Sequence, residues 1–177
     1  MARDARIILV TGGARSGKSA LAETIMARFP GPHSYIATAE ARDDEMARRI
    51  AQHRARRGPD WNLIEEPLDL PAALTRSAGQ GARLVDCLTL WLSNLMAANR
   101  PEDQAIGALC DTLSRPSAPV VLVTNELGLG IVPENRLARR FRDAHGWMNQ
   151  VVAARADEVW MAVSGLPLRL KPEREIP

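Results

Sequence analysis

The sequence is poor in cysteine and lacks long hydrophobic runs. Its 177 residues include two cysteines, Cys87 and Cys110, whose separation fits neither a metal-binding cluster nor a disulfide framework. We expect both thiols to be small buried groups in a reducing compartment, which favours the cytoplasm. No apolar run approaches the roughly 20 residues of a membrane-spanning helix, and no signal peptide is recognisable before Ile7.

An excess of charge of one sign is also absent, since 23 Lys and Arg face 21 Asp and Glu. The net charge of +2 is too small to require a nucleic-acid partner. Hydrophobic residues make up 46% of the chain, as in a folded protein and unlike a disordered one. At this length the expectation is one domain that covers residues 1–177.

A glycine-rich segment near the start carries the strongest functional signal. Residues 11–19 read TGGARSGKS and match the phosphate-binding loop G-x-x-x-x-G-K-[ST]. The apolar run 7–10 is typical of a buried strand, and residues 20–26 are typical of a helix, so the motif has the flanking elements that it needs. We expect Lys18 to reach the β- and γ-phosphates of a nucleoside triphosphate and the Ser19 hydroxyl to ligate Mg²⁺. The alternative is a glycine-rich turn that binds nothing.

Strand and helix patterns alternate along the rest of the chain. This alternation predicts an α/β fold with a mostly parallel sheet flanked by helices. The expected strands are residues 34–38, 62–65, 83–86, 119–124 and 159–163, with a possible edge strand at 166–170. The expected helices are residues 43–57, 71–78, 88–96, 102–113 and 133–154, the last with an apolar row at Leu137, Phe141, Met148 and Val152.

A magnesium–triphosphate site also needs a carboxylate, usually at the end of an apolar strand. Asp86 closes the short strand 83–86, at the carboxyl end where α/β proteins bind ligands, although Arg83 interrupts that strand. Two other interpretations stay open. In the first, the sole role of Asp86 is to cap the helix that begins at Cys87. In the second, Glu126, just after the next long strand, holds the metal instead.

The helix expected at 43–57 carries a candidate nucleophile, His53. Its helical position places it on the same side as Met46 and Ile50, facing the protein body. Nearby arginines should lower the pKa of its imidazole and attract phosphate, which suits attack on the α-phosphorus of a nucleotide. The alternative is a packed core histidine beside solvated arginines. The other histidines, His33 in a turn and His145 in the long helix, are weaker candidates.

Residues 124–136 leave a buried strand, cross two glycines and enter the long helix. Such a segment lies at the carboxyl ends of the strands, where it can approach a ligand, or it is a flexible connector. The arginines that follow it could form a solvated face or meet a substrate phosphate. They are Arg136, Arg139, Arg140 and Arg142.

These segments together resemble one family, the bifunctional adenosylcobinamide kinases / adenosylcobinamide-phosphate guanylyltransferases of cobalamin biosynthesis. The phosphate loop alone is shared by many families, but its combination with the His53 helix and the segment GIVPENR is specific. The resemblance spans nearly the whole chain. It rests on residues 11–19, 35–39 (YIATA), 43–46 (DDEM) with Arg49, Ile50 and His53, Trp61, Glu65, 86–94 (DCLTLWLSN), 125–139 (NELGLGIVPENRLAR), 141–143, 149–150 and 156–159.

The resemblance implies a P-loop NTPase of RecA-like fold that acts twice on a corrinoid substrate. It first phosphorylates adenosylcobinamide with ATP or GTP. It then transfers GMP from GTP, through a guanylylated histidine, to give adenosylcobinamide-GDP and pyrophosphate. The resemblance also implies a homotrimer. The small net charge and the lack of a long apolar run indicate neither a nucleic-acid partner nor a membrane span.

By motif match the guanylylated residue is His53, with Lys18 as the second catalytic residue and Ser19 and Asp86 on the Mg²⁺ side. The resemblance places the nucleotide contacts at Gly12, Gly13, Ala14, Arg15, Ser16, Gly17, Lys18, Ser19, Thr38, Ala39, Glu40, Arg54, Ala55, Arg56, Arg57, Glu65 and Asp86. Loops of the family vary at residues 57–60, so the resemblance does not indicate the shape of this loop.

Three other functions compete with this interpretation. A monofunctional P-loop kinase of another metabolite would form no covalent GMP intermediate. A GTP-dependent switch should carry the guanine motif [NT]-K-x-D, whereas residues 124–127 read TNEL. A RecA-like nucleic-acid motor would need a broader basic surface than a net charge of +2 provides.

Overall fold

The computed structural model describes residues 7–40, 48, 58, 60–114 and 116–172. These residues form a seven-stranded sheet in the order β3-β2-β4-β5-β1-β6-β7. Neighbouring strands pair in parallel from β3 to β6, and β7 pairs antiparallel with β6. The strands are β1 (Ile7–Gly12), β2 (His33–Ala37), β3 (Trp61–Glu65), β4 (Arg83–Asp86), β5 (Val120–Val123), β6 (Glu158–Val163) and β7 (Leu166–Lys171).

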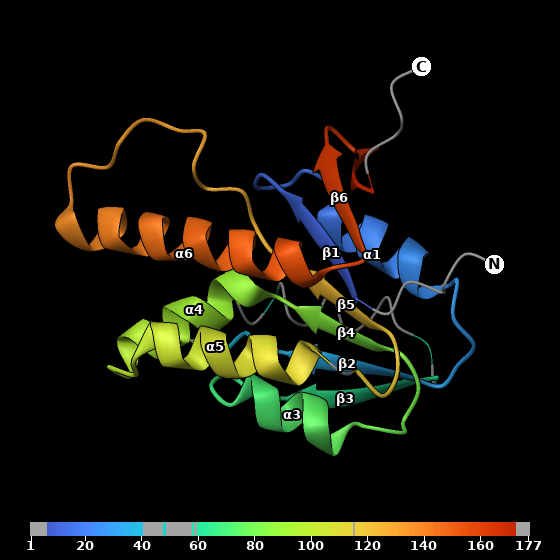
Figure 1. Ribbon diagram of the computed structural model, residues 1–177. Helices are drawn as coiled ribbons and strands as arrows, with labels where there is room; N and C mark the ends of the chain where they lie inside the picture. The colour runs from blue at the N-terminus through green and yellow to red at the C-terminus, as the bar shows by residue number, and fades with distance from the viewer. Residues whose placement is uncertain (1–6, 41–47, 49–57, 59, 115, 173–177) are drawn as a thin grey trace.

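Helices cover both faces of the sheet, as Figure 1 shows. One face packs against α1 (Lys18–Met26). The other packs against α3 (Leu70–Arg76), α4 (Leu88–Ala97), α5 (Glu102–Leu113) and α6 (Arg136–Arg155). Among the described residues, no helix combines the length and apolarity that crossing a bilayer requires.

The central strands are apolar on both faces because helices cover both. In β1, Ile7 and Leu9 belong to the core under α3–α6, whereas Ile8 and Val10 belong to the core under α1. All four residues of β5 are buried. Continuous apolar runs, rather than alternation, are what a parallel sheet buried on two sides requires. The predicted α/β class with a mostly parallel sheet is therefore confirmed.

Most predicted elements within the described residues agree with the structure to within two or three residues at their ends. The possible edge strand at 166–170 is confirmed as β7, and α1 begins at Lys18. The helix predicted at 43–57, including His53, falls almost entirely outside the described residues.

The long helix was predicted to begin at Pro133, which is wrong by three residues. Asn135 caps α6, because its side chain accepts hydrogen bonds from the amides of Leu137 (2.8 Å) and Ala138 (3.1 Å). Leu137 consequently lies in the first turn and is 63% exposed, so it does not belong to the buried row that contains Met148 and Val152.

Candidate nucleotide site

The phosphate loop joins β1 to α1 through two glycines that no other residue could replace without strain. Gly12 has φ +152°, and a Cβ there would lie 2.5 Å from Ser16 Oγ and 2.6 Å from the Ala162 carbonyl oxygen. Gly17 has φ +93°, and its Cβ would lie 3.2 Å from Gly165 Cα. Both positions need the conformations that glycine adopts at little cost.

The loop is held from the side of β6 and β7. The turn between these strands places Gly165 beside the loop, where its amide donates to the Ser16 carbonyl oxygen at 2.9 Å. Within the loop, the Ser16 amide donates to the Gly13 carbonyl oxygen at 3.3 Å. The buried Ser16 Oγ has no hydrogen-bond partner among the described residues. Its hydroxyl thus remains available to a bound group.

Lys18 folds back over this loop, where its Nζ donates to the Gly13 carbonyl oxygen at 3.1 Å. Burial lowers the pKa of Lys18, while the nearby Cys87 and Asp86 oppose that shift. The Lys18 ammonium group therefore lies against the loop and is hydrogen-bonded to a neutral carbonyl oxygen. Such a cation can exchange that carbonyl for phosphate oxygens when a nucleotide binds.

Asp86 lies beside Ser19, the other residue proposed for the metal side. The Ser19 hydroxyl donates to Asp86 Oδ2 at 3.4 Å, and the Tyr35 hydroxyl donates to the same oxygen at 3.1 Å. Helix α4 begins at Leu88 with Cys87 as its N-cap, so Asp86 precedes the capping position. A carboxylate and a hydroxyl at this separation are the oxygen ligands that Mg²⁺ takes from a protein when phosphates supply others. Among the described residues no cluster of three or more His, Cys, Asp or Glu side chains forms a metal site.

Glu126, the competing carboxylate, is engaged elsewhere. Its Oε1 accepts a hydrogen bond from the Gly128 amide at 2.6 Å, while its own amide donates to the Gly12 carbonyl oxygen at 3.0 Å. The backbone of Glu126 therefore lies against the phosphate loop, but its carboxylate turns back onto its own segment. Asp86 fits the metal side better.

The other predicted contacts follow β2 and β3 at the same edge of the sheet. Thr38, fully buried, exchanges two hydrogen bonds with the backbone of Cys87, at 2.7 and 2.8 Å. Its hydroxyl therefore fixes the junction between β4 and α4. Glu65 ends β3 and is exposed, and Glu40 is exposed beyond β2. Burial raises the pKa of the neighbouring Cys87 to about 12, which excludes this thiol as a nucleophile at neutral pH.

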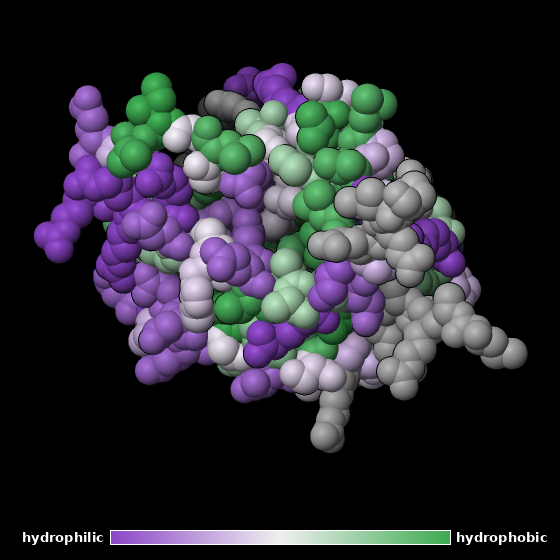
Figure 2. Space-filling model, turned by 45° about the horizontal axis from the view of Figure 1, so that its top comes forward, coloured by the Kyte–Doolittle hydropathy of each residue, from purple (hydrophilic) through white to green (hydrophobic). Residues whose placement is uncertain are grey.

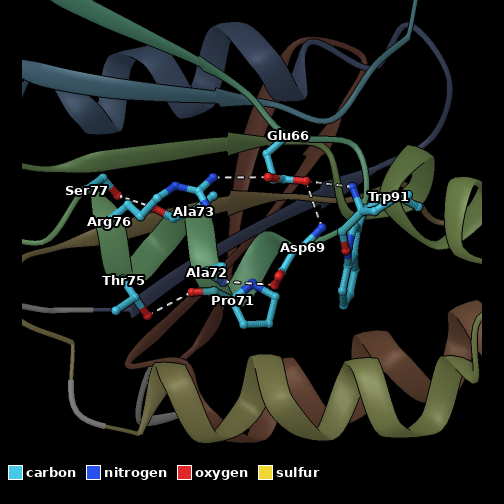
Figure 3. Close-up of polar contacts among 10 residues, drawn as sticks. Glu66, Asp69, Pro71, Ala72, Ala73, Thr75, Arg76, Ser77 and Trp91 are labelled. Atoms are coloured by element: carbon cyan, nitrogen blue, oxygen red, sulfur yellow. Dashed lines mark hydrogen bonds and ion pairs between the residues drawn. The ribbon is translucent and has the colours of Figure 1, made fainter.

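Sequence reasoning missed Glu66, the residue after β3. Its carboxylate accepts hydrogen bonds from the amides of Asp69 (2.8 Å) and Leu68 (3.2 Å) and pairs with Arg76 at 3.0 Å, as Figure 3 shows beside Trp91. Burial opposes ionisation, but these partners hold the pKa of Glu66 below its usual range. They fix the turn between β3 and α3. The signal in the sequence is a carboxylate placed three residues before an Asp-x-Pro helix start.

His53 and residues 54–57 lie outside the described residues. The chain on either side is described. It leaves the sheet beyond β2, at the edge that carries the phosphate loop, and re-enters at the amino end of β3.

The other two histidines lie away from the phosphate loop or inside the protein. His33 begins β2, at the amino ends of the parallel strands and thus opposite the phosphate loop. Its ring lies 5.0 Å from that of Trp61. His145 is 1% exposed within α6. Burial lowers the pKa of His145, and the nearby Glu126 carboxylate partly opposes that shift.

The family model for cobinamide kinase / cobinamide phosphate guanyltransferase matches residues 8–170. The chain belongs to this family. Among its curated relatives is the bifunctional adenosylcobalamin biosynthesis protein CobP of Pseudomonas aeruginosa, 50% identical over 93% of this chain and 97% of that protein. Proteins named CobU from Salmonella typhimurium and Escherichia coli are 46% and 43% identical, each over 93% of this chain and 99% of their own length.

Solved structures with low sequence identity share the fold. An ATPase from a type III secretion system superposes with a TM-score of 0.59 at 14% identity, covering 93% of this chain but 56% of its own. A protein from Pyrococcus horikoshii OT3 gives a TM-score of 0.59 at 8% identity, covering 96% of this chain and 88% of its own. This chain spans just over half the length of the secretion ATPase. The predicted P-loop NTPase fold is thereby confirmed, and the family and fold together imply nucleotide binding.

The geometry of Gly12 predicts a selective loss of nucleotide binding on substitution. In Gly12→Ala the new Cβ must displace Ser16 or the backbone of β6, a strain of about 1–3 kcal/mol at the site. We expect the Kd for a magnesium–triphosphate to rise by about ten- to hundredfold in isothermal titration calorimetry.

The matched control is Gly107→Ala, on α5, where a Cβ meets nothing within 4 Å. It makes the same chemical change at an exposed position of a helix and should leave the Kd unchanged. Equal affinities for Gly12→Ala and the unmodified protein would contradict the strain argument.

Proposed function

We propose that this chain is a bifunctional enzyme of cobalamin biosynthesis that phosphorylates adenosylcobinamide and then guanylylates the product. Family membership over residues 8–170 supports both activities. The observation that carries the chemistry is the convergence of Lys18, Ser19 and Asp86 at the carboxyl edge of the parallel strands.

In the first reaction, ATP or GTP binds with its phosphates around residues 12–19. Lys18 and the amino end of α1 neutralise charge on the phosphates, and Ser19 and Asp86 hold Mg²⁺. When bound, the ion offsets the charge that develops on the β- and γ-phosphate oxygens. The corrinoid's aminopropanol hydroxyl then receives the γ-phosphoryl group.

In the second reaction, we propose that GTP occupies the same loop and that His53 attacks its α-phosphorus. Pyrophosphate leaves, and the GMP carried by the histidine passes to the corrinoid phosphate. Nucleophilic catalysis divides one difficult transfer into two easier ones. The proposed nucleotide contacts outside the loop are Thr38, Ala39, Glu40, Arg54, Ala55, Arg56, Arg57, Glu65 and Asp86. Thr38 contributes through the position of its backbone, because its hydroxyl is already bonded to Cys87.

We further propose that residues 1–177 act as one domain, in the cytoplasm, as a homotrimer. The free, buried cysteines Cys87 and Cys110 suit a reducing compartment. Several apolar side chains before and at the start of α6 are exposed, and Figure 2 shows apolar groups gathered at that end of the molecule. They are Leu129 (84%), Ile131 (97%), Val132 (60%) and Leu137 (63%).

Removing the His53 imidazole should separate the two activities. His53→Ala should abolish acid-labile labelling by α-³²P-GTP, because the phosphoramidate can no longer form, and should leave at least part of the kinase activity. His33→Gln, at the opposite edge of the sheet, should label normally.

Lys18→Ala should weaken both reactions, since one loop serves both.

Persistent label in His53→Ala would refute its role. Absence of label in the unmodified protein, with kinase activity intact, would identify a monofunctional kinase. Full activity of Lys18→Ala in either reaction would refute a shared loop.

The two candidate carboxylates make opposite predictions for Mg²⁺. Asp86→Asn keeps the side-chain shape but removes a charged metal ligand, so the Mg²⁺ concentration for half-maximal kinase activity should rise by about tenfold or more. Glu126→Gln should leave it within about twofold, because that carboxylate bonds to the Gly128 amide. Reversal of this order would transfer the metal to Glu126.

The trimer predicts a molar mass three times the 19.4 kDa of the chain in sedimentation equilibrium. Ile131→Asp introduces a charge into the exposed apolar group and should shift the mass toward the single chain. A single-chain mass for the unmodified protein at micromolar concentration would rule the assembly out.

A further inference from the structure

A buried polar network lies where β5 ends, on the side of the sheet covered by α6. Thr124 is fully buried, and its hydroxyl donates to Asn149 Oδ1 at 2.8 Å. His145 Nε2 lies 3.0 Å from Thr89 Oγ1 and 3.3 Å from Thr124 Oγ1. Because Thr124 gives its one hydroxyl proton to Asn149, the Thr89 hydroxyl is the one of this pair that can donate to an unprotonated Nε2.

This network closes on the backbone of Asn125. The Asn125 amide donates to Thr89 Oγ1 at 2.9 Å, and Asn149 Nδ2 donates to the Asn125 carbonyl oxygen at 3.0 Å. Both backbone polar groups of Asn125 are therefore bonded to side chains, one from α4 and one from α6. The position of Asn125 is fixed by residues that lie behind the sheet as seen from the phosphate loop.

Asn125 lies between the two halves of the phosphate site. Strand β5 runs between β4, which ends at Asp86, and β1, which leads into the phosphate loop. The pairing with β1 continues past the end of β5, because the Thr124 amide donates to the Val10 carbonyl oxygen at 2.9 Å and the Glu126 amide to that of Gly12 at 3.0 Å. Asn125 thus occupies an extended position beside the loop.

Alternation along the strand directs its side chain toward the loop. Val121 and Val123 belong to the core under α1, whereas Thr124 points to α6. Successive side chains of an extended chain point to opposite faces, so Asn125 faces α1 and the phosphate loop. Leu84 of β4 lies in the same α1 core, which places Asp86 on that face as well.

The Asn125 side chain carries a hydrogen-bond acceptor that is not satisfied. Its Oδ1 is buried, and none of the described residues donates a hydrogen bond to it. A buried acceptor without a donor costs free energy, and such atoms in native proteins usually call for a bound group. The carboxylate of Asp86, one strand away, already receives hydroxyls from Ser19 and Tyr35.

We propose that Asn125 Oδ1 accepts the hydrogen bond of the substrate hydroxyl that attacks the γ-phosphorus in the kinase reaction. His145, Thr89 and Asn149 are positioning residues that hold Asn125 there. This inference rests on the proposed kinase activity.

Asn125 makes and breaks no covalent bond in this step. The hydroxyl oxygen forms a bond to the γ-phosphorus, and the bond from that phosphorus to the β–γ bridging oxygen breaks. The electron pair leaves with the nucleoside diphosphate, and the hydroxyl proton passes to solvent as the phosphate ester forms. A hydrogen bond from the hydroxyl to Oδ1 aims an oxygen lone pair at phosphorus, which is the positioning that phosphoryl transfer depends on.

Formation of the guanylylated enzyme supplies the discriminating measurement, because that step uses no substrate hydroxyl. Asn125→Ala should lower the kcat of corrinoid phosphorylation by about ten- to hundredfold. The KM for the nucleotide should change less than about threefold, and labelling by α-³²P-GTP should proceed as in the unmodified protein. Asn62→Ala, on the exposed side of β3, is the matched control and should change neither reaction.

The positioning residues are tested by a conservative pair. Thr89→Ser keeps the hydroxyl and should keep the kinase kcat within about threefold, whereas Thr89→Ala should lower it in the same sense as Asn125→Ala. Thermal unfolding of each variant shows whether the fold is intact, and the serine variant remains informative if the alanine variant unfolds.

Two outcomes would overturn the inference. One is an Asn125→Ala kinase kcat within about threefold of the unmodified protein. The other is an equal loss of labelling and phosphorylation, which would indicate general damage to the phosphate loop. Absence of kinase activity in the unmodified protein would instead refute the proposed function itself.

Discussion

The hydrogen bonds that converge on the Asp86 carboxylate join the parts of the site that the chain supplies separately. Ser19 reaches it from the first turn of α1, and Tyr35 reaches it from β2. These contacts exist because β4 lies between β2 and β5, with β1 one strand further on, so that four parallel strands end at one edge. A parallel sheet gathers residues from distant points of the sequence at its carboxyl edge, and this edge is where the loop, the carboxylate and Asn125 meet.

The phosphate loop depends on support from outside its own motif. Glycine is required at position 12 because β6 brings the Ala162 carbonyl oxygen within 2.6 Å of where a Cβ would lie. The Ser16 carbonyl oxygen accepts a hydrogen bond from the Gly165 amide in the β6–β7 turn. Strand β6 is in turn tied to the end of α1, where Arg28 and Glu158 form two hydrogen bonds at 2.8 and 3.0 Å. The loop that precedes α1 and Arg28, which follows it, are therefore both held against β6 and its turn. A loop fixed in this way can receive phosphates without first paying the entropy of ordering itself.

Much of this arrangement could be predicted because its signals are local. Three signals each determine structure within a few residues. They are the glycine spacing of the loop, the apolar run 7–10 and the consecutive residues Lys18 and Ser19. The strand ending at Asp86 looked weak because Arg83 interrupts it, yet Arg83 is 3% exposed and donates to the carbonyl oxygens of Leu74 (2.8 Å) and Ala118 (2.6 Å). Burial lowers the pKa of this guanidinium. Only the tertiary fold brings these carbonyls to the arginine, so no local pattern indicates that a charge could lie inside this strand.

The same limit explains why His145 ranked below His53. A histidine that precedes a glycine within a helix has no local pattern that indicates a partner, and its contacts with Thr89 and Thr124 come from 56 and 21 residues away. The network also lies in a core that apolar residues could have filled, since each buried polar group must regain the hydrogen bonds that it loses from water. What an apolar core could not supply is a fixed orientation for the backbone of Asn125. The two proposed reactions differ in their first nucleophile, a substrate hydroxyl in one and an imidazole in the other. Only the hydroxyl arrives on a ligand and needs to be aimed by the protein, and the polar network lies behind the strand end that faces it.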